Sequence, residues 1–232
     1  MQIPILANYV LEKLDNPVWH SLSETHREFA IDYGDIKFYQ LDYCPFGAFR
    51  NPGNISAYIT QYAGLTGEFF IVGGRPEFPG SVRLKKELVS NQMIIHERTG
   101  IEITEDIKVL GEDHAAALYN LVNLVQPGYF RSRTFRLGDY YGIFKNGQLV
   151  AVTGERMKMA GLTEVSAVVT HPDHTGKNYA KQLVTHTINR IMAKNSIPFL
   201  HVAETNSAAI GLYEKLGFKT RRKISFWNLV AD

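Results

Sequence analysis

The sequence predicts an α/β protein, and three observations predict it. The 232 residues are 45% apolar, 12% aromatic and 21% charged, which is typical of a globular chain with a buried core. Runs with the period of strands are interspersed with runs with the period of helices. An Asn-Gly pair at 146–147 separates two apolar runs, which indicates a β-hairpin. A chain of this length can form one elaborate domain or two small ones.

The first half is predicted to be a mixed α/β region. Strands are expected at residues 35–41 and 68–72, with a short helix at 55–63 between them and a further strand at 88–96. This half contains no motif that points to a chemistry. The pattern changes near Thr99-Gly100, so we divide the chain into an N-terminal accessory region of unknown role, 1–105, and a second region, 106–232.

The second half has a sharper periodicity. A strand at 107–110 precedes a helix that Asp113 can cap and Pro127-Gly128 ends. The predicted elements that follow are hairpin strands at 140–144 and 149–159, a buried β-branched strand at 165–169, an amphipathic helix at 180–191, a strand at 199–203, a helix capped by Asn206 and ended by Gly217, and a strand at 224–230.

The segment 168–180 contains the clearest chemical signal. It leads from the buried strand through a glycine-containing loop into the amphipathic helix. The first N–H groups of a helix have no partner within it and concentrate positive charge, so they can bind a phosphate. Gly176 allows a close approach of the backbone, and Asn178 tolerates a left-handed turn. A plain strand-turn-helix connection is the alternative.

Two motifs follow one another in the second half of the chain: Val168-Val169-Thr170-His171-Pro172-(x)3-Gly176-Lys177-x-Tyr179-Ala180 and Asn206-(x)2-Ala209-(x)2-Leu212-Tyr213-(x)3-Gly217-Phe218. In this order they resemble the GNAT superfamily of acyl-CoA-dependent N-acyltransferases, most closely its branch that resembles glycine N-acyltransferases. The resemblance covers residues 107–230, about half of the chain. It implies a GNAT fold with a mixed, largely antiparallel central sheet in 106–232, preceded by an N-terminal α/β region.

The resemblance implies a binding site for acetyl-CoA or another short acyl-CoA. The pyrophosphate loop departs from the family pattern, because it lacks the leading Arg or Gln and has Asn178 where a second glycine is common. Backbone N–H groups provide most of such a site, so the departure should weaken binding without abolishing it. Lys177 either compensates in part or is a solvated lysine. The implied cofactor-binding residues are Val168, Val169 and Thr170 for the pantetheine arm, Thr175, Gly176, Lys177, Asn178, Tyr179 and Ala180 for the pyrophosphate, and Asn206 and Ala209 beside the arm.

Tyr213 and Glu164 are the expected catalytic residues. The family has a tyrosine beside the CoA sulfur at the position of Tyr213, and a phenol with a pKa of about 10 keeps its proton for a departing thiolate. The alternative is that Tyr213 only packs its helix on the core. Glu164 opens the central strand, where some family members have a catalytic base, although an ordinary carboxylate is about six pKa units too acidic for an amine. Glu204 is a second candidate, and a solvated glutamate is the alternative.

Several other site classes find little support. The only cysteine, Cys44, gives neither a disulfide nor a thiolate metal site, and His171 and His174 lack a third ligand, so no metal is expected. His201 is expected to be a packed core residue. The net charge of +2 argues against a nucleic-acid partner. A basic run is predicted to be a solvated turn, or alternatively a contact to the 3′-phosphate of CoA; it consists of Lys219, Arg221, Arg222 and Lys223.

Hydropathy predicts no membrane partner. No apolar run reaches the roughly 18 residues of a transmembrane span, and the apolar segment 1–10 has neither a basic leader nor a cleavage pattern after it. A cytoplasmic protein is expected.

The expected activity is direct transfer of an acetyl or short acyl group from acyl-CoA to the primary amine of a small molecule or peptide, with a backbone N–H of Val168 or Val169 stabilising the oxyanion. A noncatalytic acyl-CoA sensor or interaction module is one alternative. A nucleic-acid binder that uses the basic run together with Arg131, Arg133 and Arg136 is another.

Overall fold

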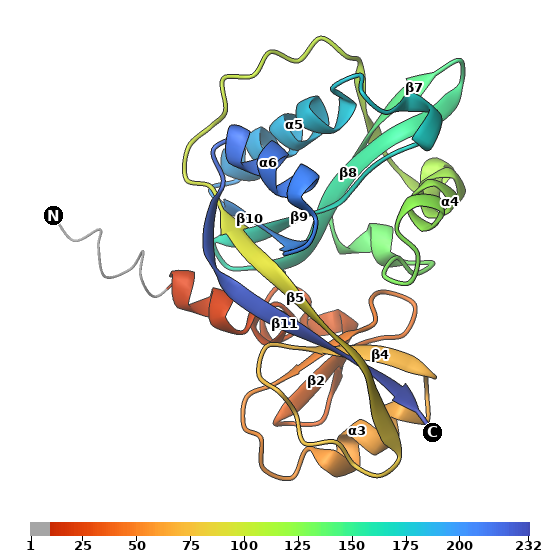
Figure 1. Ribbon diagram of the computed structural model, residues 1–232, viewed down its shortest axis with the longest axis vertical. Helices are drawn as coiled ribbons and strands as arrows, with labels where there is room; N and C mark the ends of the chain where they lie inside the picture. The colour runs from red at the N-terminus through yellow and green to blue at the C-terminus, as the bar shows by residue number, and fades with distance from the viewer. Residues whose placement is uncertain (1–9) are drawn as a thin grey trace, which may run out of the picture.

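The structure, a computed structural model, describes residues 10–232. In this part of the chain eleven strands form one sheet in the order β1-β2-β3-β4-β11-β5-β10-β9-β8-β7-β6. Figure 1 shows helices α4, α5 and α6 around β7 to β10 in one lobe, and β2, β4 and α3 in another. The long strands β5 and β11 run through both lobes.

The sheet is mixed and mostly antiparallel, as predicted. Only the β3/β4 and β9/β10 pairs are parallel among the described strands. The strands are β1 (Ala30–Asp32), β2 (Ile36–Tyr39), β3 (Phe46–Phe49), β4 (Glu68–Val72), β5 (Val82–Ile94), β6 (Ile107–Leu110), β7 (Tyr140–Lys145), β8 (Gln148–Met159), β9 (Leu162–Thr170), β10 (Ile197–Ala203) and β11 (Lys219–Ala231).

Five complete α-helices and five short 3₁₀ turns lie within residues 10–232, and residues 10–12 are also helical. The helices are α2 (Pro17–Ser23), α3 (Ser56–Ala63), α4 (Ala115–Val125), α5 (Tyr179–Ala193) and α6 (Ser207–Lys215). The turns are η1 (Lys13–Asp15), η2 (Arg27–Phe29), η3 (Glu112–His114), η4 (Thr134–Leu137) and η5 (Pro172–His174). None of the described helices combines the length and the apolar character that crossing a bilayer requires.

The strongest local signals produced the predicted elements. The apolar face of α5 is buried at Leu183, Val184, Ile188 and Ile191. The Asn206 side chain caps α6 by accepting a hydrogen bond from the N–H of Ala209 at 3.1 Å. At the β7/β8 hairpin, Asn146 and Gly147 both have positive φ, 51° and 79°, which a two-residue turn between these strands requires.

Three predicted features differ from the structure. Asp113 does not cap α4, because it lies inside η3, and the helix begins two residues later at Ala115. Strands β5 and β11 each begin several residues before their predicted starts, at Val82 and Lys219. These early parts consist largely of exposed charged side chains, and an apolar pattern therefore does not mark them.

The proposed boundary at residue 105 falls between β5 and β6, within one continuous sheet. Strand β5, from the N-terminal side, pairs with β10 and β11, and β11 pairs in turn with β4. One buried core also combines both sides, because Leu14, Val18 and Leu22 pack with Met157 and Phe199. The N-terminal region therefore contributes directly to the surface around β8 and β10. The apolar segment 1–10, which is not expected to be a signal peptide, lies outside the described residues except for Val10.

Candidate active site

Strands β9 and β10 separate halfway along their length. Their parallel ladder has three pairs and ends at Glu164 and Phe199. Strand β9 continues to Thr170 and β10 to Ala203 without further pairing between them. The edge of β9 that faces β10 therefore presents free backbone N–H and C=O groups beyond Glu164, which an extended ligand can bind.

A β-bulge lies in the same part of β9. The register with β8 shifts between the pairs Val152–Val169 and Gly154–Ser166, so that Ala167 and Val168 lie opposite a single residue. Ala167 adopts a left-handed conformation with φ 51°, which is costly for a residue with a Cβ atom. The bulge turns the backbone of β9 at the point where its other edge is open.

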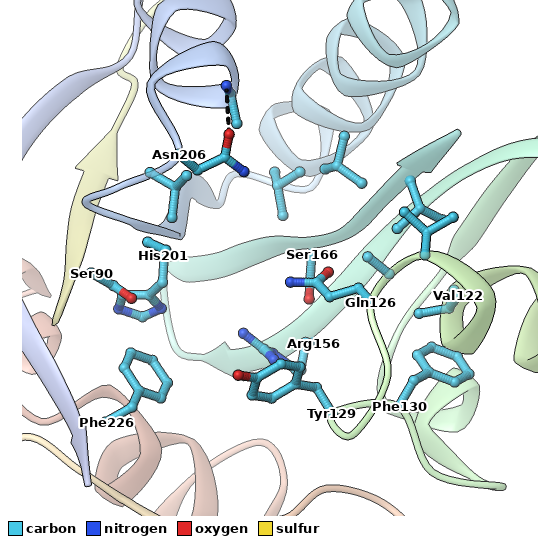
Figure 2. A pocket seen from close by; sticks show the side chains of 18 of the residues that line it. Ser90, Val122, Gln126, Tyr129, Phe130, Arg156, Ser166, His201, Asn206 and Phe226 are labelled. Carbon is cyan, nitrogen blue, oxygen red and sulfur yellow. Dashed lines mark hydrogen bonds between the residues drawn. The ribbon is translucent and has the colours of Figure 1, made fainter. Parts of the chain in front are cut away.

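A cavity of about 360 Å³ lies at this opening (Figure 2). Asn206 lies at one end of it, and Arg156, Tyr129 and Phe226 lie at the other. Its lining combines residues of both lobes: Phe46, Leu88, Ser90, Val122, Val125, Gln126, Tyr129, Phe130, Thr134, Arg156, the β9 residues 165–169, His201, Val202, Ala203, Asn206, Ala209, Tyr213 and Phe226.

Tyr213 lines this cavity and also packs its helix on the core. Its side chain is 7% exposed, and its ring lies edge-on to Phe218 with 5.9 Å between the centroids. Burial raises the pKa of Tyr213 to about 12. The hydroxyl therefore keeps its proton throughout the neutral range and can donate a hydrogen bond into the cavity.

The predicted phosphate loop lies between the 3₁₀ turn η5, which follows β9, and helix α5. Thr175, Gly176, Lys177 and Asn178 are exposed, and Gly176 and Asn178 have positive φ of 75° and 60°. The N–H of Gln182 donates to the carbonyl of Asn178 at 3.2 Å, so the N–H groups before it have no carbonyl within α5 to bind. The exposed turn can thus accept an anion at the start of α5.

Glu164 lies behind the cavity wall and is fully buried. Its carboxylate accepts hydrogen bonds from Nε and Nη2 of Arg156, both at 2.8 Å, from Nδ1 of His201 at 2.8 Å, and from the N–H of Met157 at 3.3 Å. The last N–H is freed by a second bulge, where Arg156 and Met157 of β8 lie opposite Glu164. Four donors therefore occupy the two carboxylate oxygens.

These contacts decide the ionisation of Glu164. Burial alone would raise its pKa, but the charge of Arg156 and the hydrogen bonds from Arg156 and His201 outweigh burial and lower the pKa to about 2. A carboxylate whose oxygens already accept four hydrogen bonds, and whose pKa is so low, is poorly suited to take a proton from an amine directly.

The surroundings of His201 determine which ring nitrogen carries its proton. The Gln92 amide donates to the carbonyl of Leu14 at 2.8 Å, and its oxygen accepts from Arg221 at 3.2 Å, which fixes the amide orientation. Its second N–H therefore points at Nε2 of His201, 3.1 Å away. His201 is thus assigned as the neutral tautomer that donates from Nδ1 to Glu164.

The structure brings some of the predicted site residues together and leaves others outside. Val168, Val169, Asn206, Ala209 and Tyr213 line the cavity. Thr170, the segment 175–180 and Glu164 do not line it. Thr170 is the last residue of the lining strand β9, and η5 separates β9 from the segment 175–180. Glu204 is exposed and binds Nζ of Lys223 at 2.6 Å.

The basic run and the histidine pair have other contacts. Arg221 and Arg222 both donate to Asp15, at 2.7 and 2.8 Å, so these two cations are already paired. Nδ1 of His171 accepts from the N–H of Asp173 at 3.3 Å and so caps η5. The described residues contain no group of three or more metal-ligating side chains.

Sequence reasoning missed Arg156, Tyr129 and Phe46 as lining residues. They lie in a strand, in the loop after α4 and in a short strand of the other lobe, and no local spacing connects them. His201 was expected to be a core residue. Its side chain is 2% exposed, as a core residue would be, yet it also lines the cavity.

Comparisons with known proteins agree with this architecture. Residues 140–227 match the family described as FR47-like protein. A GNAT-family protein from Novosphingobium aromaticivorans is 32% identical over 94% of this chain and 98% of that chain, with a TM-score of 0.86. No curated protein sequence matches the chain.

More distant structures share the fold alone. A GCN5-related N-acetyltransferase-like protein from Streptococcus suis is 15% identical over 94% of this chain and 97% of its own, with a TM-score of 0.59. A GCN5-related N-acetyltransferase from Kribbella flavida is 12% identical over 94% and 95%, with a TM-score of 0.60.

The architecture is that of the GNAT acetyltransferases, a class of proteins that use acyl-CoA as cosubstrate. The chain belongs to the GNAT family of acetyltransferases.

Proposed function

We propose that this protein is an N-acyltransferase that moves an acetyl or other short acyl group from acyl-CoA directly to a primary amine. The observation that supports this most strongly is the cavity at the end of the β9/β10 ladder, which both the bulged strand and Tyr213 line. The order of the two sequence motifs favours the branch that resembles glycine N-acyltransferases, and this finer assignment belongs to the proposal.

Acyl-CoA would lie along the open edge of β9. Backbone groups of Val168 and Thr170 would bind the pantetheine arm, and the N–H groups of 175–180 would bind the pyrophosphate. The side-chain oxygen of Asn206 already caps α6, so its amide N–H₂ group is what remains for the arm.

The neutral amine would attack the thioester carbon, and a backbone N–H at the bulge, from Val168 or Val169, would stabilise the oxyanion. The C–S bond breaks as Tyr213 donates its proton to the sulfur, and the proton lost by the nitrogen restores the phenol. The pKa of Tyr213, about 12, keeps this proton available.

Glu164, predicted as the general base, would act in this scheme through its neighbours. It holds the Arg156 guanidinium and the His201 ring in place at the cavity wall. Since no carboxylate lines the cavity among the described residues, the amine enters as the free base or loses its proton to water.

The test combines calorimetry and a thiol-release assay with the purified chain. We expect CoA and acetyl-CoA to bind, and a panel of primary amines to stimulate release of free CoA thiol. Binding without amine-dependent thiol release would favour a noncatalytic acyl-CoA sensor. Absence of binding would contradict both functions, and retention on DNA that weakens with salt would favour the nucleic-acid alternative.

A further inference from the structure

The end of the cavity away from Asn206 has an unusual charge pattern (Figure 2). Arg156 is the only Lys, Arg, Asp or Glu side chain among the described lining residues. Its charge is balanced from behind by Glu164, which does not itself line the cavity. A ligand in this part of the cavity therefore meets hydrogen-bond donors of a cation and no acceptor carboxylate.

Only one edge of the Arg156 guanidinium is occupied. Nε and Nη2 donate to the two oxygens of Glu164, whereas Nη1 makes no hydrogen bond to any residue within 10–232. A guanidinium has five N–H groups, and the edge formed by Nη1 and Nη2 is a second two-donor fork. This fork matches the two oxygens of a carboxylate.

The plane of the guanidinium is held by an aromatic ring. The Arg156 carbon Cζ lies 4.8 Å from the ring centroid of Phe46, and its side chain is 13% exposed. A side chain fixed on one edge by a carboxylate and on one face by a ring loses little freedom when a second carboxylate binds.

Aromatic side chains surround the same part of the cavity. The Phe46 ring lies 5.4 Å from that of Phe226 and 6.3 Å from that of Tyr129, between centroids. Tyr129 and Arg156 both line this end of the cavity (Figure 2). These rings provide an apolar wall for the body of an acceptor that is larger than glycine.

We propose that the acceptor is an amine that also bears a carboxylate and an apolar or aromatic body, and that the free edge of Arg156 binds this carboxylate. The proposal rests on the proposed acyl transfer and names its acceptor class. A zwitterion adds no net charge to a wall where Arg156 and Glu164 already cancel. A polyamine would instead bring several cations to a wall without a carboxylate.

The test compares matched amines with the unmodified protein and acetyl-CoA. We expect phenylalanine to exceed phenethylamine, and leucine to exceed 3-methylbutylamine, by at least about tenfold in kcat/KM for thiol release, since a charged bidentate contact is lost in each decarboxylated partner. Phenylalanine should also exceed glycine and spermidine. Equal or faster reaction of the decarboxylated amines would overturn the acceptor assignment and leave acyl transfer intact. Lack of reaction with every amine would instead contradict the proposed function itself.

An Arg156→Lys variant tests the residue. Lysine keeps a cation beside Glu164 but lacks the second fork, so the preference for phenylalanine over phenethylamine should fall at least about tenfold while the KM for acetyl-CoA stays unchanged. Inhibition by 3-phenylpropanoate, competitive with the amine, should weaken in parallel. Arg83→Lys, at a surface arginine that pairs with Asp232, is the matched control. An unchanged preference in folded Arg156→Lys would refute the role of Arg156.

Discussion

Nδ1 of His201 lies 2.8 Å from the carboxylate of Glu164, at the point where the ladder between β9 and β10 ends. The contact joins two strands whose backbones pair no further, so side chains hold them where hydrogen bonds of the ladder stop. Gln92 of β5 extends the contact to the other lobe through the Leu14 carbonyl. The opening of the candidate active site is thus stabilised by a buried polar network.

The ion pair between Arg156 and Glu164, at the centre of this network, should stabilise the fold only when both charges are present. Glu164→Gln leaves Arg156 buried without a counter-charge, and we expect a loss of about 3–5 kcal/mol in the free energy of unfolding, measured with urea. The double variant Arg156→Met, Glu164→Met removes both charges. Its loss in the free energy of unfolding should be smaller than the sum of the losses in Arg156→Met alone and Glu164→Met alone. Strictly additive losses would show that the two charges are not coupled.

Tyr213→Phe should lower turnover and leave acyl-CoA binding nearly intact. The phenol is buried and makes its proposed contribution only when the thiolate leaves, so kcat should fall about 10²-fold and the calorimetric Kd for acetyl-CoA should change little. Because the pKa of Tyr213 is about 12, ionisation of this group should not limit the rate below pH 10. Unchanged turnover would show that Tyr213 only packs its helix on the core.

The fold could be predicted from the sequence wherever a signal is local. The cap at Asn206, the hairpin at 146–147 and the apolar face of α5 each depend on residues within one element, and each was confirmed. The short helix α2 and strand β3 were missed. Their residues are buried against strands that are distant in the sequence, and so the pattern within the segment is too short to identify them.

The chemistry of the candidate site was harder to predict for the same reason. The position of Glu164 on its strand does not indicate that Arg156 and His201 face it from two neighbouring strands. Those partners reverse the expected effect of burial on its pKa. Spacing along the chain cannot give the charge environment of a buried carboxylate, which depends on the register of three strands.

The turn before α5 should depend on its backbone conformation. At Gly176, with φ 75°, a Cβ atom would meet no neighbour within 4 Å, so a substitution acts through the backbone alone. Gly176→Val should weaken CoA binding by about 5–30-fold, because a β-branched residue disfavours the left-handed region by about 1–2 kcal/mol. Gly176→Asn is the matched control and should bind nearly normally. Similar affinity of the valine variant in calorimetry would exclude the turn as the pyrophosphate site.

Acid should destabilise the protein in two stages, and His26 should account for the first. This side chain is buried between the two lobes, where it contacts Ser21, Tyr39 and the carbonyl of Leu137 at 3.1, 3.0 and 2.9 Å. Burial, reinforced by the charge of Lys158, lowers its pKa from 6.5 to about 4. Between these values the unfolded chain binds more protons than the folded chain, so stability is complete above pH 6.5 and is lost as the pH falls toward 4.

For His26, the difference of about 2.5 pKa units between the unfolded and folded chain corresponds to about 3 kcal/mol in the free energy of unfolding, at about 1.36 kcal/mol per unit. Glu164, with a folded pKa of about 2 against 4.5, should contribute a second loss as the pH falls below 4.5. Urea unfolding at closely spaced pH values should therefore show a decline from pH 6.5 to 4 that flattens in His26→Gln and persists in His96→Gln, whose side chain is exposed. The slope identifies the titrating group even if the His26 variant is less stable at every pH, because a constant loss shifts the curve without changing its gradient. A decline of equal steepness in His26→Gln would assign the first stage to other groups.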